Sequence, residues 1–159
     1  MPFSTLSKTQ LDCLSALRTE AVEFMIVGGY AVRFHGLMRP TEDLDLLISN
    51  EQRNIEALKR FWLKAGFSNA SNMMLVAQEE WAMIDWYDVD FLTTIRGGNF
   101  RRLHERALSE TVAGGQTLII SKADLIAERE MALGDQSQKE WHECISIELD
   151  ILKLGNSGA

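Results

Sequence analysis

Apolar and polar residues follow one another along the chain in runs that predict both helices and strands. Leucines at near-helical spacing predict an opening helix over 4–19, with Ser4 or Ser7 as its N-cap. The apolar, β-rich run 22–27 predicts a strand that ends at Gly28-Gly29, after which a helix-compatible pattern resumes. The expected order is strand, glycine turn, helix.

The rest of the chain continues in the same manner. The pattern predicts strands over 42–48, 73–77 and 81–92, helices over 51–65, 99–107, 122–132 and 137–154, and a short hairpin within 111–120 that turns at Gly114-Gly115. Strands and helices that alternate in this way indicate an α/β (α+β) protein.

The length of 159 residues fits a single domain that buries most of its core. No internal repeat, low-complexity tract or flexible linker divides the sequence. We therefore expect one domain over 1–154, followed by a disordered tail over 155–159.

The charge balance changes the picture of possible partners. A net charge of −7 provides no overall field that would attract nucleic acid, so RNA would have to bind at a local basic patch. Four arginines around a predicted helix form the candidate patch, and a solvated helix face is the simpler interpretation of them. They are Arg96, Arg101, Arg102 and Arg106.

The cysteines and the N-terminus bear on the compartment. Cys13 and Cys144 have no spacing typical of a zinc site or a disulfide framework, which indicates a reducing, cytoplasmic environment. The first residues lack the features of a signal peptide, and no apolar run approaches the roughly 18 residues of a membrane span. We expect a cytoplasmic protein that does not enter a membrane.

Two features upstream and within the 42–48 strand carry candidate chemistry. Asp43 and Asp45 flank Leu44, so both carboxylates should project from one face of the strand and could clamp a divalent cation. A solvated strand end is the alternative interpretation. Gly28-Gly29 could bring backbone N–H groups close to a phosphate, or could simply make a turn.

A further acid lies in the run Asp88-Val89-Asp90-Phe91-Leu92. Asp90 precedes two apolar residues and is the better candidate for a buried carboxylate, whereas Asp85 and Asp88 fit a solvated turn or a capping role. A glycine pair after one strand, an Asp-x-Asp on the next and a single Asp on a later strand together indicate a three-carboxylate site beside a phosphate-binding turn.

These residues resemble the pattern of the nucleotidyltransferase superfamily, which combines a Gly-Gly or Gly-Ser turn, an Asp-x-Asp or Asp-x-Glu about a dozen residues later, and a third acid. The stretch FMIVGGYAVRFHGLMRPTEDLDLLI is most similar to the small stand-alone bacterial members, including the toxin-like AbiEii and MenT proteins. VDFLTTIRG and ISKADLIAER extend the likeness over most of 24–129.

The resemblance implies a single-domain mixed β-sheet flanked by helices, with a site at one edge of the sheet. It also implies a Mg²⁺-dependent (or Mn²⁺-dependent) transfer of a nucleoside monophosphate from an NTP such as ATP to a hydroxyl of a tRNA, a protein or a small molecule. Asp43, Asp45 and Asp90 would bind the metal and act in catalysis, and Asp90 would also be a candidate to accept a proton.

The nucleotide would be bound by a second group of residues. Gly28 and Gly29 would contact phosphate. Arg39 and Thr41, in the loop before the acids, could bind phosphate oxygens. The family often presents a basic residue near Lys122 and Arg129, and Arg129 is the nearest match. Arg39 as a surface charge and Lys122 as part of a solvated helix face are the alternatives.

The sequence departs from its relatives in two places. The basic-then-acidic signature that often follows the late helix is blurred over 131–140, and Gly29 stands where many active members carry Ser. A catalytically degenerate nucleotide-binding module, or a toxin–antitoxin partner module with a cognate antitoxin, is therefore the alternative function.

Overall fold

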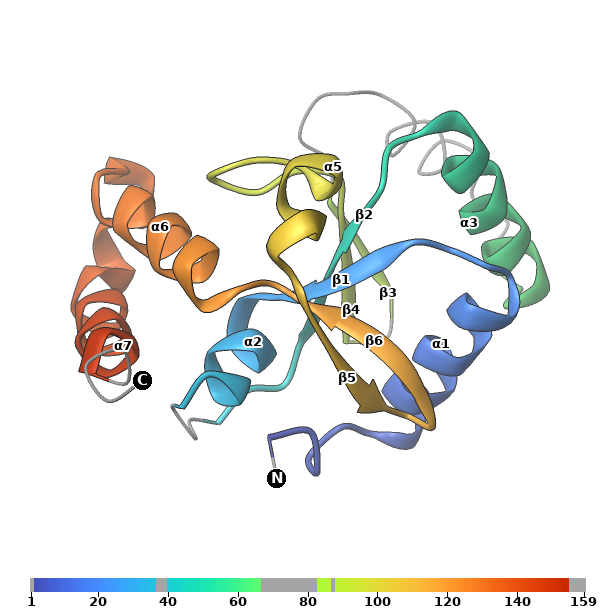
Figure 1. Ribbon diagram of the computed structural model, residues 1–159, viewed down its shortest axis with the longest axis horizontal. Coiled ribbons are helices and arrows are strands. Elements are labelled where there is room, and N and C mark those ends of the chain that lie inside the picture. Colours follow the sequence, from blue (N-terminus) through green and yellow to red (C-terminus); the bar gives the residue numbers. More distant parts are fainter. Residues whose placement is uncertain (1, 37–39, 67–82, 87, 155–159) are drawn as a thin grey trace.

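The computed structural model describes residues 2–36, 40–66, 83–86 and 88–154, with 83–86 described by their backbone (Figure 1). Its centre is a six-stranded sheet with the order β3-β4-β2-β1-β6-β5. The strands are β1 (Phe24–Val27), β2 (Leu44–Ile48), β3 (Met83–Trp86), β4 (Val89–Leu92), β5 (Leu108–Val112) and β6 (Gly115–Ile119). Parallel pairs β1–β6 and β2–β4 alternate with antiparallel pairs β1–β2, β3–β4 and β5–β6. The predicted mixed sheet flanked by helices is thus confirmed.

Apart from the short α5 (Phe100–Leu103), the helices lie in two groups on either side of the strands in the view of Figure 1. α1 and α3 contact each other at one side, whereas α2 contacts α6, and α6 packs along α7 at the other. The helices are α1 (Lys8–Thr19), α2 (Gly28–Phe34), α3 (Gln52–Lys64), α5 (Phe100–Leu103), α6 (Lys122–Leu133) and α7 (His142–Leu154), with 3₁₀ turns η1 (His104–Arg106) and η2 (Gln136–Trp141).

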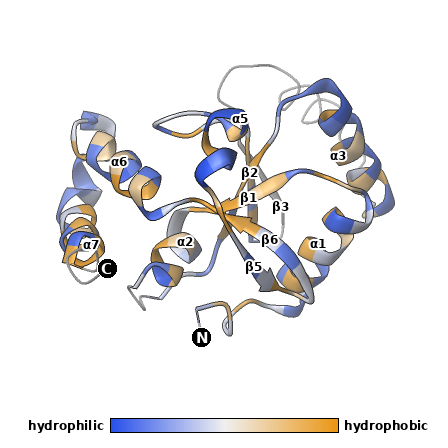
Figure 2. Ribbon diagram, viewed as in Figure 1, coloured by the Kyte–Doolittle hydropathy of each residue, from blue (hydrophilic) through white to orange (hydrophobic). Residues whose placement is uncertain are grey.

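The hydrophobic core is centred on β1 and β2. Every residue of β1 is buried, and β2 is buried everywhere except at Asp45, which is partly exposed. Figure 2 shows the hydrophobic colour concentrated on these central strands, while α1 and α3 carry both colours. The aromatic rings of Phe61 and Trp62 on α3 pack against Phe91 of β4 and so fix the helix over the sheet. A central strand buried on both faces explains the continuous apolar run in its sequence.

The strand predicted over 81–92 was wrong in its extent, because its described part is a hairpin of β3 and β4. Asp88, in the connection, has a φ of 63°, a left-handed conformation that Asp tolerates better than most residues. The second hairpin also differs: β5 and β6 are joined through Ala113 and Gly114, with φ of 52° and 77°, and Gly115 already belongs to β6. Two consecutive positive φ values are typical of the turn that matches strand twist.

The glycine pair is likewise part of a regular element. Gly28 and Gly29 do not form a separate turn, since they are the first residues of α2. Asp43 precedes β2, and the last predicted helix is a 3₁₀ turn followed by α7. The strand predicted over 73–77 and the tail over 155–159 lie outside the described residues. Within the described ranges, no helix has the length and apolar character needed to cross a bilayer.

Candidate functional site

Asp45 and Asp90 stand side by side on the parallel strands β2 and β4, where the register pairs them directly. Paired residues of neighbouring strands project from the same face, and here the two side chains are hydrogen-bonded to each other. Burial, followed by the charge of Asp90 and this hydrogen bond, raises the pKa of Asp45 to about 7. Two carboxylates this close cannot both be charged at low cost, so they share a proton or take up a cation.

The carboxylate of Asp45 is seated against the start of α2. The backbone N–H of Gly29 donates a hydrogen bond to Asp45, which favours its charged form. Gly28 has a φ of 64°, and a Cβ built on it would lie 2.8 Å from the Asp45 Cγ and closer still to its Oδ2. Two independent reasons therefore favour glycine at position 28: its backbone conformation, and the carboxylate that fills the space where a Cβ would lie.

A buried glutamine joins the two acid-bearing strands at their beginnings. The Nε2 of Gln10, in α1, donates to the carbonyl oxygens of Glu42 at 2.7 Å and Asp88 at 2.9 Å. The N–H of Leu44 also donates to the Asp88 carbonyl, at 2.9 Å. Gln10 is only 2% exposed, so these bonds are protected from water and hold β2 and β4 together immediately before Asp45 and Asp90.

A cavity of about 600 Å³ opens beside the acid pair. Its apolar wall comes from the sheet and from α6, and its polar residues are Asp45, Arg96, Glu128, Arg129 and Gln138. Val27, Gly28, Leu92, Ile95, Ile120 and Leu125 complete the lining. The volume is in the range of small-molecule and cofactor sites. The cavity is thus lined by two carboxylates, Asp45 and Glu128, and by two arginines, Arg96 and Arg129.

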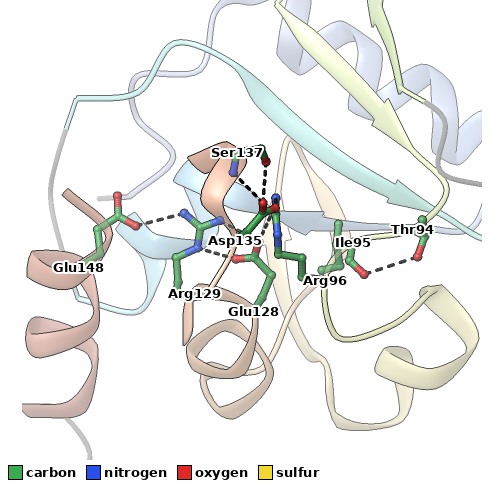
Figure 3. Close-up of polar contacts among 8 residues, drawn as sticks. All are labelled: Thr94, Ile95, Arg96, Glu128, Arg129, Asp135, Ser137 and Glu148. Atoms are coloured by element: carbon green, nitrogen blue, oxygen red, sulfur yellow. Dashed lines mark hydrogen bonds and ion pairs between the residues drawn. The ribbon is translucent and has the colours of Figure 1, made fainter. Parts of the chain in front are cut away.

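The two arginines of the cavity belong to a chain of ion pairs (Figure 3). Arg129 donates from Nη2 to the Glu128 Oε1 at 2.8 Å and from Nε to Oε2, and its Nη1 lies 3.6 Å from the Glu148 Oε2. Arg96 lies 3.7 Å from Glu128 and 2.6 Å from Asp135. Burial by itself would lower the pKa of Arg129, but its bonds to Glu128 and Glu148 raise it. This ion-pair chain, 135–96–128–129–148, connects the loop after β4 to α6 and α7.

The acid pair fits a hard divalent cation in its chemistry. Carboxylate oxygens are the ligands that Mg²⁺ prefers, and Mg²⁺ usually keeps several waters while one or two carboxylates and substrate phosphates complete its shell. Across residues 2–36, 40–66 and 88–154, no three His, Cys, Asp or Glu side chains come together as a metal site. Asp45 and Asp90 would therefore supply two ligands, and the backbone register places Asp85 of β3 opposite Asp90.

Comparison with known proteins finds similarity among the solved structures. No family model matches this sequence. No curated protein matches it either. Among solved structures, the chain is similar to an antigenic nucleotidyltransferase-like protein from Paracoccidioides brasiliensis, with 17% sequence identity and a TM-score of 0.49, over 92% of this chain and 77% of the other.

The predicted site residues are divided between the cavity and its surroundings. Asp45, Gly28 and Arg129 line the cavity. Asp43 is exposed and raises the pKa of Asp45 through its charge, as a third and weaker carboxylate. Thr41 is partly exposed in the connection before β2. Lys122 is the first residue of α6. Burial is the main cause that lowers the pKa of His35, and the charge of Lys122 lowers it further. Arg39 lies outside the described residues.

Sequence reasoning did not assign Arg96 and Glu128 to the site. Arg96 was placed in a surface patch with three other arginines, but it lines the cavity and is paired with two acids. Arg106 of that patch is paired with Asp124. Charged neighbours such as Glu128 and Arg129 in AERE are usual on a solvated helix face, so the sequence gives no local sign of this pairing. Arg101, Arg102 and Arg106 are exposed, as expected for a solvated face, whereas Arg96 is partly buried.

Proposed function

We propose that this chain is a metal-dependent nucleotidyltransferase that transfers a nucleoside monophosphate from an NTP to an acceptor hydroxyl. The observation that supports this function best is the pairing of Asp90 with Asp45, which lines a cavity together with Arg96 and Arg129. Carboxylates for a cation and guanidinium groups for phosphate are the two recognition elements that Mg²⁺·NTP requires. The resemblance of 24–48 to the superfamily pattern points in the same direction.

The residues divide the work in the following way. A divalent cation held by Asp45 and Asp90 would neutralise phosphate charge and acidify the attacking hydroxyl. Gly28 leaves room for the Asp45 carboxylate, and Gln10 keeps the two strands in place. Arg129 would bind the phosphate chain through its planar fork. Asp43, close enough to influence Asp45 electrostatically, completes the proposed acid set.

The chemical step forms one bond and breaks another. The acceptor hydroxyl oxygen attacks the α-phosphorus, the bond between that phosphorus and the α–β bridging oxygen breaks, and pyrophosphate leaves. The hydroxyl proton passes to a carboxylate, for which Asp90 is the candidate. Because catalysis of phosphoryl transfer depends on positioning and charge stabilisation, a small set of acids and arginines is sufficient.

The test is transfer of label to an acceptor. The protein is incubated with Mg²⁺ and NTPs labelled at the α- or the γ-phosphate, together with tRNA, total protein or polyhydroxylated small molecules as acceptors. The proposal predicts stable labelling from the α-phosphate only, and its loss in Asp43→Ala, Asp45→Ala and Asp90→Ala with the fold intact. Transfer from the γ-phosphate, or unchanged transfer in any of the three variants, would contradict it.

A second function of the same fold is a binding module without turnover. The arginines of the cavity are already paired with acids, and the N–H of Gly29 is already used by Asp45. An inactive module would bind nucleotide but release no pyrophosphate with any acceptor. A pyrophosphate-release assay run beside the labelling experiment separates the two functions.

A further inference from the structure

The cavity holds an unusual charge arrangement around Glu128. This carboxylate receives two hydrogen bonds from Arg129 and lies 3.7 Å from Arg96, so a single anion sits against both guanidinium groups (Figure 3). Its side chain is only 9% exposed, and it lines the cavity together with both arginines. Two guanidinium groups that converge on one buried anion have the donor geometry of a phosphate site.

The partners behind the arginines keep both side chains in place. Asp135 accepts a bond of 2.6 Å from Arg96, and Ser137 donates to Asp135 from its N–H at 2.9 Å and its hydroxyl at 2.7 Å. Glu148, 3% exposed, lies on the far side of Arg129. Asp135 and Glu148 are not among the residues that line the cavity, whereas Glu128 is. Of the three acids in the ion-pair chain, Glu128 alone therefore lines the cavity that a ligand would enter.

We propose that Arg96 and Arg129 form a two-arginine phosphate site in which Glu128 takes the place of the phosphate until a ligand displaces it. This inference rests on the proposed function, and it names the polyphosphate of the nucleotide as the ligand of this site and Glu128 as the group that limits its affinity. Arg96, which reaches the cavity from the loop after β4, thereby becomes a nucleotide-binding residue. Its second partner, Asp135, is a positioning residue.

The charges of the ion-pair chain are consistent with the displacement of Glu128 by phosphate. The ion-pair chain contains three acids and two arginines and so carries a net negative charge, which opposes the entry of a polyanion as long as Glu128 remains in place. If Glu128 turns away toward solvent, the two guanidinium groups are left with one acid each and can bind phosphate oxygens. Removing the charge of Glu128 should therefore raise the affinity for polyphosphate.

Calorimetric titration with inorganic tripolyphosphate, in EDTA and at low ionic strength, tests the proposal on the full chain. We expect Glu128→Gln to bind tripolyphosphate about tenfold more tightly than wild type, and Arg96→Gln added to it to remove that gain. Glu130→Gln, an exposed glutamate on the same helix, and Arg101→Gln, an exposed arginine near Arg96, are the matched controls and should change the affinity little.

Several results would overturn the proposal. They are an affinity in Glu128→Gln no higher than in wild type, an equal gain in Glu130→Gln, and an unchanged affinity on adding Arg96→Gln. If Glu128 only ties α6 to the loop after β4, its replacement will lower the melting temperature and leave the affinity for tripolyphosphate unchanged. If Glu128→Gln does not fold, Glu128→Asp is the substitute, because it keeps the charge but withdraws the carboxylate from the arginines. It should also bind tripolyphosphate more tightly than wild type, by a smaller factor.

The design separates this proposal from the function on which it rests. The titration contains no divalent cation and no nucleoside, so it does not depend on Asp45 and Asp90. A tenfold gain in Glu128→Gln without any Mg²⁺-dependent NTP binding would contradict the transferase proposal alone. Normal Mg²⁺-dependent NTP binding with no effect of Glu128→Gln or Arg96→Gln would contradict the two-arginine site alone.

Discussion

The carboxylate of Asp45 occupies the space that a side chain on Gly28 would need. In Gly28→Ala the new Cβ meets that carboxylate and must also adopt a φ of 64°. We expect the free energy of unfolding to fall by more than the roughly 1–2 kcal/mol of a left-handed alanine. Mg²⁺-dependent nucleotide binding should be lost, because Asp45 is pushed away from Asp90. Urea unfolding and calorimetry measure the two effects.

Gly114→Ala is the matched control for this substitution. Gly114 has a φ of 77° in the β5–β6 turn, but nothing lies within 4 Å of a Cβ built there. It should show the backbone cost alone and bind nucleotide as wild type does. Equal losses of stability in the two variants, with binding retained in Gly28→Ala, would show that the contact with Asp45 is unimportant.

The raised pKa of Asp45 predicts how stability depends on pH. The folded protein holds the Asp45 proton up to a pH of about 7, whereas the unfolded chain loses it near its ordinary value of 3.8, so the contribution of Asp45 to stability is lost as the pH rises between these values. In EDTA at pH 8, Asp45→Asn should therefore be more stable than wild type by roughly 1–3 kcal/mol. The difference should shrink toward pH 5.

Chemical denaturation at pH 5, 6, 7 and 8 provides the test. The exposed Asp12, paired with Lys8 on the surface, gives the control Asp12→Asn, which should change stability little. Added Mg²⁺ should stabilise wild type at pH 8 but not Asp45→Asn. A destabilised Asp45→Asn at pH 8 without metal would mean that Asp45 is a structural residue.

Gln10, although it lies in the N-terminal helix, should contribute to both the stability of the protein and its metal binding. Gln10→Ala removes the two side-chain bonds to the carbonyls of Glu42 and Asp88, and also the bond that its Oε1 accepts from the Ser7 N–H at the start of α1. We expect a loss of about 1–3 kcal/mol in unfolding free energy and weaker metal binding. Gln52→Ala, on the exposed surface of α3, should cost little. Wild-type metal affinity in Gln10→Ala would show that Gln10 does not support the metal site.

Glu148 offers a test of the ion-pair chain away from the cavity. Its side chain is 3% exposed and lies 3.6 Å from Arg129, so Glu148→Gln removes the charge of a buried partner. We expect a loss of roughly 1–3 kcal/mol. Glu143→Gln, exposed on the same helix, should be close to neutral. Thermal unfolding of both variants decides the matter, and equal melting temperatures would show that Glu148 contributes nothing through Arg129.

The central part of the fold could be predicted from the sequence because its signals are local. The apolar run 22–27, the glycine pair and the alternation around Asp45 specify a buried strand, a helix start and a second strand without any distant contact. The hairpin of β3 and β4 could not be predicted in the same way. Its turn depends on Asp88 in a left-handed conformation, which the sequence allows but does not require.

The site was predictable in part for the same reason. Asp45 and Asp90 are each marked by their position on an apolar strand, although only the parallel register of β2 and β4 makes them neighbours. Arg96 and Glu128 lie 32 positions apart in the sequence and meet where α6 contacts the loop after β4, a tertiary contact with no periodic signal. Glu148 could not be predicted for the same reason. Its role as an ion-pair partner becomes visible only when the fold places Arg129 beside it.

The most direct test of the account is calorimetric titration with each of the four ribonucleoside triphosphates, with and without Mg²⁺, in wild type and in Asp45→Asn and Asp90→Asn. The account predicts that at least one NTP binds to wild type only with Mg²⁺, and that both variants lose this binding while they remain folded. Binding that is equally strong without metal, or that survives in both variants, would contradict the claim that the Asp45–Asp90 pair holds the metal–nucleotide complex.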